Sequence, residues 1–286
     1  MAFNFQTFKT RALTAILFVI IMAIGLLWSR WSFFILFSVI HFGCWIEYQK
    51  LVTLFNKDYS KINVFHRYGV MLAGFALLMF FTNGELSVGG IFLNEAGLWL
   101  GLAFVILFPL VQLIATRNFF LKNIGYSFSG LLYISLSLAL LINMRNRWVE
   151  EDYQLNLTVP LLVIITLWIN DTMAYIVGSF IGKHPLSSIS PKKTWEGTVG
   201  GIILAMAVMS LLAYATGRIS ITHAAVIAAL ASIAGTYGDL FESKLKRMAG
   251  VKDSGNIMPG HGGFLDRFDS LLFASTVVWF YVYFFL

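Results

Sequence analysis

The densest group of charged residues lies near the C-terminus, in residues 238–270. Two of its carboxylates, Asp266 and Asp269, are about one helical turn apart, so both can point at a single cation. Hard divalent cations such as Mg²⁺ take carboxylate oxygens as ligands and commonly sit on substrate phosphates. The stretch therefore predicts a cation site for phosphate chemistry. Its first part holds polar residues at helical spacing that share one face, namely Asp239, Glu242, Ser243 and Lys246.

A glycine-rich break separates the two parts of this stretch. In it, His261 stands between two glycines, where the backbone can approach a ligand closely. An alternative is a surface lattice of ion pairs that joins Asp and Glu to Lys and Arg. This alternative accounts for the charges but not for their placement beside apolar helices and glycines. The break contains Gly255, Pro259, Gly260, Gly262 and Gly263.

A second polar segment, residues 182–201, is basic and rich in hydroxyl groups, and Pro185 and Pro191 would break any helix in it. Backbone amides at a helix start near Thr194 or Trp195 would add to the charge of the lysines, which predicts an anion site. Helix caps in a solvated basic loop are the alternative. A GxxxxGK[ST] sequence is absent, so the segment is not a P-loop. Its lysines and neighbouring hydroxyl residues are Lys183, Lys192, Lys193, Ser190 and Thr194.

A third polar feature, Asn170 and Asp171, interrupts an apolar run at residues 157–179. A carboxylate inside a membrane helix costs roughly 2.5–3.5 kcal/mol on insertion scales, so Asp171 should face a cavity or a partner. The alternative is that both residues only form hydrogen bonds to neighbouring helices.

Together the three features offer carboxylates for a metal and cations for a polyphosphate, next to apolar helices. They include no Ser/His/Asp nucleophile arrangement. This combination suits phosphoryl or nucleotidyl transfer to a membrane-embedded acceptor, because charge stabilisation and alignment carry most of the catalysis in such reactions.

The elements that must position these residues are membrane helices. The chain has 286 residues, of which 58% are hydrophobic and only 12% charged, and its mean hydropathy is +0.79. Soluble domains carry about 25% charged residues, so the composition excludes an ordinary soluble fold, and it is too apolar for disorder. The single cysteine, Cys44, excludes a disulfide framework or a cysteine metal cluster. The positive net charge is assigned to lipid rather than to nucleic acid.

Nine apolar stretches are long enough to suggest membrane helices, so we expect an all-α, polytopic integral membrane protein. We expect a single membrane-embedded domain over residues 1–286, with a helical scaffold at 1–150 and a catalytic half at 157–286. The stretches lie at about 12–29, 31–49, 68–83, 97–116, 124–143, 157–179, 197–216, 221–242 and 267–286.

The distribution of basic residues predicts the orientation. With a cytoplasmic N-terminus and nine spans, 16 of the 20 Lys and Arg residues fall on the cytoplasmic side. This bias follows the positive-inside rule and predicts a multi-pass protein of the inner cell membrane whose site faces the cytoplasm. The four residues on the other side are Arg30, Arg145, Arg147 and Arg218.

The C-terminal motifs resemble those of a known family, the phosphatidate cytidylyltransferases or CDP-diacylglycerol synthases. The resemblance covers about the last 120 residues and includes the stretches 170–172 and 190–197. Met258 departs from the usual Ile, Leu or Phe, which is an apolar exchange. The signature runs Ser243-x-Leu245-Lys246-Arg247-x4-Lys252-Asp253-x-Gly255, then Pro259-x-His261-Gly262-Gly263-x-x-Asp266-Arg267-x-Asp269.

The resemblance implies a reaction in which CTP and phosphatidic acid give CDP-diacylglycerol and pyrophosphate with Mg²⁺. Carried over by motif position, Asp239, Asp266 and Asp269 would hold the metal. Asn170, Asp171, Lys183, Lys192, Lys193 and Ser243 would bind the substrates. Lys246, Arg247, Lys252 and Arg267 would neutralise phosphate charge, and Asp253 and His261 would orient neighbours or assist proton movement.

Two other functions compete with this prediction. A CTP-using lipid kinase would transfer the γ-phosphoryl group to a lipid alcohol. A transporter for an anionic solute would use the basic segment as its binding site, but the ionisable residues gather toward one face of the membrane rather than at its midplane. A homodimer and a second, monovalent cation are left open by the sequence.

Overall fold

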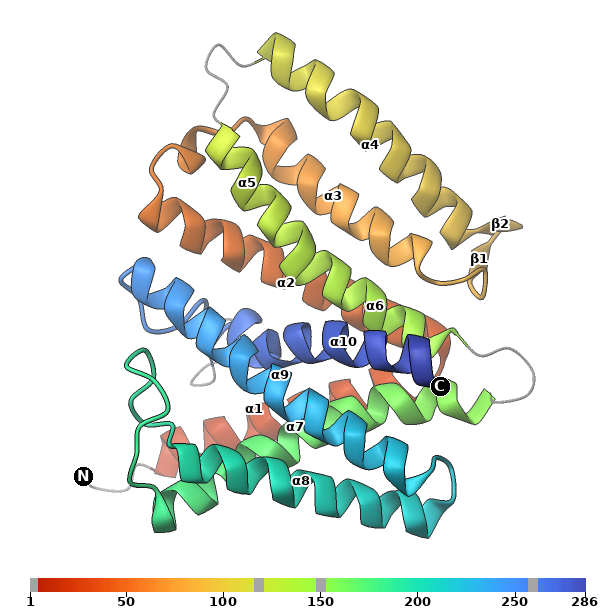
Figure 1. Cartoon of the computed structure of the whole chain (residues 1–286). Helices are drawn as coiled ribbons and strands as arrows, with labels where there is room; N and C mark the ends of the chain where they lie inside the picture. Colours follow the sequence, from red (N-terminus) through yellow and green to blue (C-terminus); the bar gives the residue numbers. More distant parts are fainter. Residues whose placement is uncertain (1–4, 116–120, 148–152, 257–261) are drawn as a thin grey trace.

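The computed structural model describes residues 5–115, 121–147, 153–256 and 262–286. In these ranges the protein is almost entirely helical, as the sequence predicts (Figure 1). A short antiparallel hairpin of β1 (Ser87–Val88) and β2 (Ile91–Phe92) is the exception. The helices are α1 (Phe5–Leu27), α2 (Arg30–Phe55), the 3₁₀ turn η1 (Tyr59–Lys61), α3 (Val64–Phe80), α4 (Leu93–Ala115), α5 (Leu121–Gly130), the π-helical η2 (Leu131–Leu136), α6 (Ser137–Arg145), α7 (Tyr153–Ile181), α8 (Trp195–Thr216), α9 (Ile221–Met248) and α10 (Leu265–Phe285).

Seven helical segments of the described ranges are long and apolar enough to cross a membrane. One of them, Lys122–Arg145, combines α5, η2 and α6. Two further apolar helices, Leu13–Leu27 and Val64–Phe80, are shorter. Each of the nine predicted stretches falls on one of these helices, but the number of spans and the orientation of the chain stay predictions.

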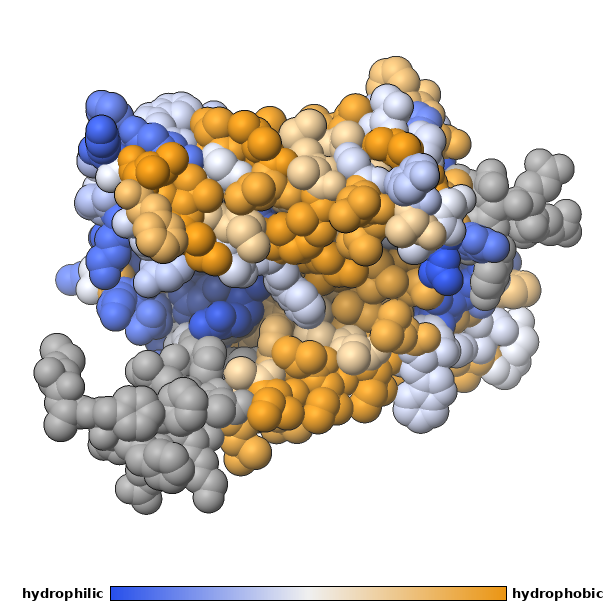
Figure 2. Space-filling view, turned by 90° about the horizontal axis from the view of Figure 1, so that it is seen from below, coloured by the Kyte–Doolittle hydropathy of each residue, from blue (hydrophilic) through white to orange (hydrophobic). Residues whose placement is uncertain are grey.

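The surface of the molecule matches a lipid environment. Hydrophobic residues cover the middle of the face shown in Figure 2, and hydrophilic residues gather at its two ends. Large apolar side chains point outward, among them Val105 of α4 and Leu211 of α8, both about two thirds exposed. Such patches are unfavourable in water but suit hydrocarbon, where only helices and closed barrels satisfy the backbone. The protein is therefore a polytopic membrane protein.

Helices α7, α8, α9 and α10 pack on one another and gather the polar motifs at one end of the bundle (Figure 1, left). This end collects the C-terminal ends of α2, α7 and α9 and the N-terminal ends of α8 and α10. Gly238 makes the close approach of α9 to α10 possible, since a Cβ atom there would lie 2.5 Å from the carbonyl oxygen of Asp269.

We expect Gly238→Ala to lower the stability of the bundle, because the added methyl group has no room against α10. Overpacking of this kind costs about 1–3 kcal/mol. The measurement is the thermal unfolding midpoint of the purified protein in detergent. Gly101→Ala is the matched control, because a Cβ atom at this helical glycine meets nothing within 4 Å. Equal midpoints for the two variants would contradict the proposed close packing.

Candidate active site

Three carboxylates from two helices converge at this end of the bundle. Asp239 and Glu242 of α9 and Asp269 of α10 each offer an oxygen, and these oxygens lie within 4.8 Å of one another. Glu242 is fully buried, and Asp269 is 8% exposed. Asp269 Oδ1 accepts a hydrogen bond from the backbone N–H of Ser270 at 2.6 Å. We call Asp239, Glu242 and Asp269 the carboxylate cluster.

Lysine side chains neutralise part of this negative charge. Lys246, one turn after Glu242 on α9, forms ion pairs with Glu242 and with Asp266, the second at 2.6 Å. Lys193 reaches from the loop before α8 and forms an ion pair with Asp239. The ion pairs of Lys246 are largely buried, whereas the paired side chains of Lys193 and Asp239 are 31% and 27% exposed. One oxygen of Glu242, Oε1, has no hydrogen-bond partner in the described part of the chain.

Asp266 lies outside the carboxylate cluster and holds the loop that precedes α10. Its Oδ2 accepts hydrogen bonds from the backbone N–H groups of Ser254 at 2.9 Å and Gly263 at 2.8 Å, and it lies 2.9 Å from Ser254 Oγ. Its Oδ1 accepts the bond from Lys246. Gly262 between these contacts has a φ of +82°, a conformation that favours glycine. Both carboxylate oxygens of Asp266 therefore already accept hydrogen bonds from other residues of the protein.

The basic segment before α8 forms a tight loop. It closes through the hydrogen bonds Leu186 N to Lys193 O at 2.7 Å and Trp195 N to His184 O at 2.9 Å. Thr194 caps α8 by accepting a hydrogen bond from Gly197 N at 3.2 Å, as the cap interpretation predicts. Of the three lysines, Lys193 turns toward the carboxylate cluster, whereas Lys183 and Lys192 are exposed.

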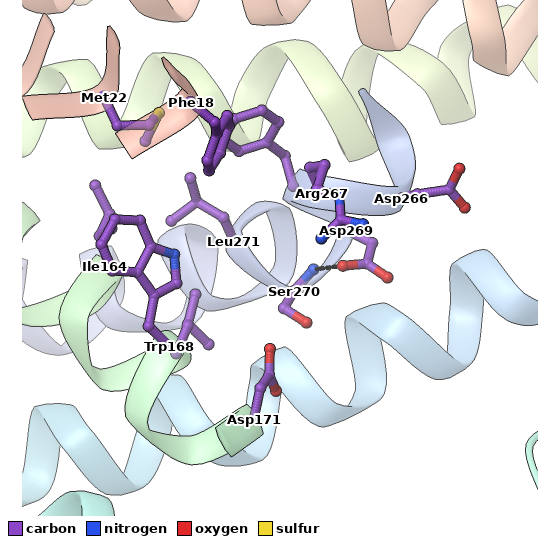
Figure 3. A pocket seen from close by; sticks show the side chains of 12 residues that line it. Phe18, Met22, Ile164, Trp168, Asp171, Asp266, Arg267, Asp269, Ser270 and Leu271 are labelled. Atoms are coloured by element: carbon purple, nitrogen blue, oxygen red, sulfur yellow. Dashed lines mark hydrogen bonds between the residues drawn. The ribbon is translucent and has the colours of Figure 1, made fainter. Parts of the chain in front are cut away.

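A small cavity of about 160 Å³ lies between α1, α7 and α10, beside the carboxylate cluster (Figure 3). Asp171 of α7 faces α10 across from Ser270 and Asp269 (Figure 3). Asn170, by contrast, is only 3% exposed and sits next to the close α7–α8 contact at Gly201. The cavity has a polar side and an apolar side, and its lining includes Phe18, Met22, Ile164, Trp168, Asp171, Arg267 and Asp269.

The remaining predicted residues flank this centre. Ser243 Oγ donates to Asp239 Oδ1 at 3.3 Å. Arg247 is exposed and donates to the carbonyl oxygen of Val251 at 3.4 Å. Lys252 and Asp253 are exposed at the start of the loop. His261 lies outside the described residues.

A carboxylate from the first half of the chain enters the site, which the sequence analysis did not anticipate. Glu47 of α2 is 7% exposed and accepts hydrogen bonds from Ser254 Oγ at 2.7 Å and from the backbone N–H groups of Phe264 and Leu265, both at 2.9 Å. Its only sequence signal is that it is a lone carboxylate in an apolar stretch. Glu242 was recognised as part of a polar helix face but not as a candidate cation ligand.

This arrangement can bind a hard cation and several phosphate oxygens at the border of the apolar region. The carboxylates supply oxygen ligands, and the ammonium groups of Lys193 and Lys246 lie close by. A deprotonated side-chain nucleophile is not needed for a substrate that brings its own ionised oxygen.

Comparison with known proteins points to one family, the cytidylyltransferases. The sequence profile described as "Cytidylyltransferase family" matches residues 9–285. A Bacillus subtilis protein named "Phosphatidate cytidylyltransferase" is 38% identical over 180 residues, which cover 62% of this chain and 65% of that protein. A protein of the same name from Staphylococcus saprophyticus is 36% identical over 188 residues, covering 65% and 72%. "Phosphatidate cytidylyltransferase 4, chloroplastic" from Arabidopsis thaliana is 40% identical over 134 residues, covering 46% and 34%.

We expect Lys246→Met to destabilise the protein strongly, because it leaves Glu242 and Asp266 without their shared cation. Removing one partner of a buried ion pair costs about 3–5 kcal/mol. The loss should appear as a lower thermal unfolding midpoint in the absence of divalent cations. Lys244→Met is the control, since Lys244 is exposed on the same helix. Equal stability of the two variants would show that Lys246 does not neutralise a buried cluster.

Proposed function

The chain belongs to the cytidylyltransferase family, and we propose that it transfers the cytidylyl group of CTP to phosphatidic acid, which yields CDP-diacylglycerol and pyrophosphate. The observation that carries the proposal is the meeting of the carboxylate cluster with Lys193 and Lys246 at one end of membrane helices. The names of the similar bacterial and plant proteins support the same reaction.

We propose that the carboxylate cluster binds Mg²⁺, and the donor set supports this. Three carboxylate oxygens lie within 4.8 Å of one another, and the buried Oε1 of Glu242 lacks a hydrogen-bond partner among the described residues. Carboxylate oxygens are the side-chain ligands that Mg²⁺ prefers. This assignment keeps Asp239 and Asp269 from the sequence prediction but uses Glu242 in place of Asp266. When bound, Mg²⁺ supplies positive charge to the phosphate oxygens and to the leaving pyrophosphate.

The two lysines of the site would change partners when substrate binds. In this structure Lys193 and Lys246 neutralise Asp239 and Glu242. If the cluster held a divalent cation, Lys193 and Lys246 would no longer be needed to neutralise it and could bind phosphate oxygens, Lys246 while it keeps its second ion pair with Asp266. Arg267 lines the cavity beside the cluster, and we propose that the exposed Lys183, Lys192, Arg247 and Lys252 contribute positive charge toward the substrates. The site thus exchanges internal ion pairs for contacts with the triphosphate and the lipid phosphate.

The nucleophile in the proposed reaction is an oxygen of the phosphatidate phosphate. It attacks the α-phosphorus of CTP, a new P–O bond forms, and the bond between that phosphorus and the α,β-bridging oxygen breaks to release pyrophosphate. A phosphate monoester has a second pKa near 6, so the attacking oxygen is largely ionised at neutral pH. The protein therefore needs to align the two substrates and to neutralise charge, not to supply a strong base.

The position of the site suits one soluble and one lipid substrate. Polar groups gather at the end of the bundle, whereas the cavity beside them continues between apolar residues of α1 and α7. We propose that phosphatidic acid places its headgroup at the cluster from the lipid side and that CTP enters from the aqueous side. The excess of basic residues supports placing this side in the cytoplasm of a bacterial inner membrane, where CTP is present.

The purified protein should convert CTP and phosphatidic acid to CDP-diacylglycerol only when Mg²⁺ is present. With CTP labelled at the α-phosphorus the label should enter the lipid, whereas a γ-phosphorus label should leave in pyrophosphate. Lipid labelled from the γ-phosphorus would instead identify a kinase. Solute uptake into liposomes without CTP would identify a transporter.

Asp269→Asn and Glu242→Gln should each reduce turnover by more than the roughly 10–100-fold typical of residues that only support a metal ligand. They should also weaken binding of Mn²⁺, measured by electron paramagnetic resonance as a probe for Mg²⁺. Asp58→Asn is the control, because Asp58 pairs with Lys61 in an exposed position and belongs neither to the carboxylate cluster nor to the cavity lining. Turnover near wild type at limiting Mg²⁺ in folded variants would refute the metal assignment.

A further inference from the structure

We propose that Glu47 of α2 is a positioning residue of the active site. It anchors the start of α10 and thereby fixes the position of Asp269 in the carboxylate cluster. The proposal rests on the proposed function for its catalytic consequence. Its structural part stands on the contacts of Glu47 alone.

Glu47 forms hydrogen bonds with residues that are far from it in the sequence. It accepts hydrogen bonds from Phe264 and Leu265, which are 217 and 218 residues away, and from Ser254, 207 residues away. The two backbone N–H groups lie at the start of α10 and lack helical partners, so a carboxylate there satisfies both and also interacts favourably with the helix dipole. Glu47 therefore works as a helix cap supplied by another helix.

The shape of the segment is fitted to this carboxylate. A Cβ atom at Gly255 or Gly263 would overlap the carboxylate oxygens of Glu47, so a side chain at either position would displace this carboxylate from its hydrogen bonds. One turn before Glu47, Gly43 leaves the space into which the ring of Phe264 packs. Phe264 is thus held by α2 at two points: its ring packs at Gly43, and its backbone N–H binds Glu47.

A continuous chain of polar contacts links Glu47 to the carboxylate cluster. Ser254 Oγ donates to Glu47 Oε2 at 2.7 Å and lies 2.9 Å from Asp266 Oδ2, and it is 1% exposed. Asp266 in turn holds Lys246, which pairs with Glu242 of the cluster.

Asp269 lies one turn after Leu265, whose N–H Glu47 binds. Loss of Glu47 would therefore release the segment that fixes both Asp266 and Asp269. Gly255 and Gly263, which the sequence analysis placed in the glycine-rich break, make room for the carboxylate of Glu47.

Hydrogen–deuterium exchange on the full chain in nanodiscs tests the anchoring. Glu47→Gln keeps the shape but turns an amide toward backbone donors, and we expect exchange in residues 262–270 to accelerate by at least about tenfold, which corresponds to losing a buried hydrogen bond or more. Gly43→Ala, which leaves the carboxylate in place but displaces Phe264, should accelerate the same region. Glu85→Gln is the matched control, because Glu85 pairs with Arg30 at the other end of α2.

The second measurement tests whether Glu47 affects cation binding and turnover at the carboxylate cluster. In Glu47→Gln the apparent Mn²⁺ dissociation constant should rise and kcat should fall, each by about 10–100-fold, as is typical for residues that support metal ligands, while Glu85→Gln matches wild type in both. A residue with only a structural role would lower the amount of folded protein but would leave the Mn²⁺ affinity and kcat of the folded fraction unchanged.

Unchanged exchange in residues 262–270 of both Glu47→Gln and Gly43→Ala, or an unchanged Mn²⁺ affinity in both, would overturn the proposal. If Glu47→Gln does not fold, Gly43→Ala decides the outcome. Absence of CTP-dependent transfer in the wild-type protein would refute the proposed function separately, because the exchange and Mn²⁺ measurements need no turnover.

Discussion

Buried negative charge is the constraint on which this end of the molecule depends. Glu47, Glu242 and Asp269 are each less than a tenth exposed, in a protein whose buried residues are mostly apolar. An uncompensated charge in such a place costs several kcal/mol, so each carboxylate needs donors, a counter-ion or a metal. Glu47 accepts hydrogen bonds from backbone and hydroxyl donors, whereas Lys246 pairs with one oxygen of Glu242 and leaves Oε1 without a hydrogen-bond partner among the described residues. Among the described residues, the cluster of Asp239, Glu242 and Asp269 has fewer hydrogen-bond and ion-pair donors than carboxylate oxygens, and this shortage makes it a candidate for a cation.

The same constraint connects the fold to the proposed chemistry. Lys193 and Lys246 form ion pairs with the cluster, and the proposed function assigns phosphate binding to the same two cations. If a cation bound the cluster and phosphates bound the lysines, the carboxylates and the ammonium groups would each keep a partner of opposite charge. The helices contribute rigidity, because α9 and α10 approach closely at Gly238 and α2 holds the start of α10 through Glu47. A transfer reaction that relies on alignment rather than on a protein nucleophile benefits from such a fixed frame.

The sequence predicts the helices well because long apolar stretches have few alternatives in a membrane. It also predicts that Asp239, Asp269 and Lys193 belong to one site, because helices that alternate in direction bring their motif-bearing ends together. Two features escape it. Which carboxylates converge in the cluster and which one binds the loop depends on side-chain geometry, so the sequence could not tell Asp266 and Glu242 apart. The role of Glu47 depends on a contact across more than 200 residues, which no local pattern encodes.

The most direct test of the account is the position of the cation itself. Crystals of the protein grown with Mn²⁺ and a non-hydrolysable CTP analogue would locate the metal by its anomalous scattering. The account predicts a peak bounded by the carboxylates of Asp239, Glu242 and Asp269, with Lys193 and Lys246 turned toward the triphosphate. A metal bound instead at Asp266, with the ion pairs of both lysines unchanged, would contradict it.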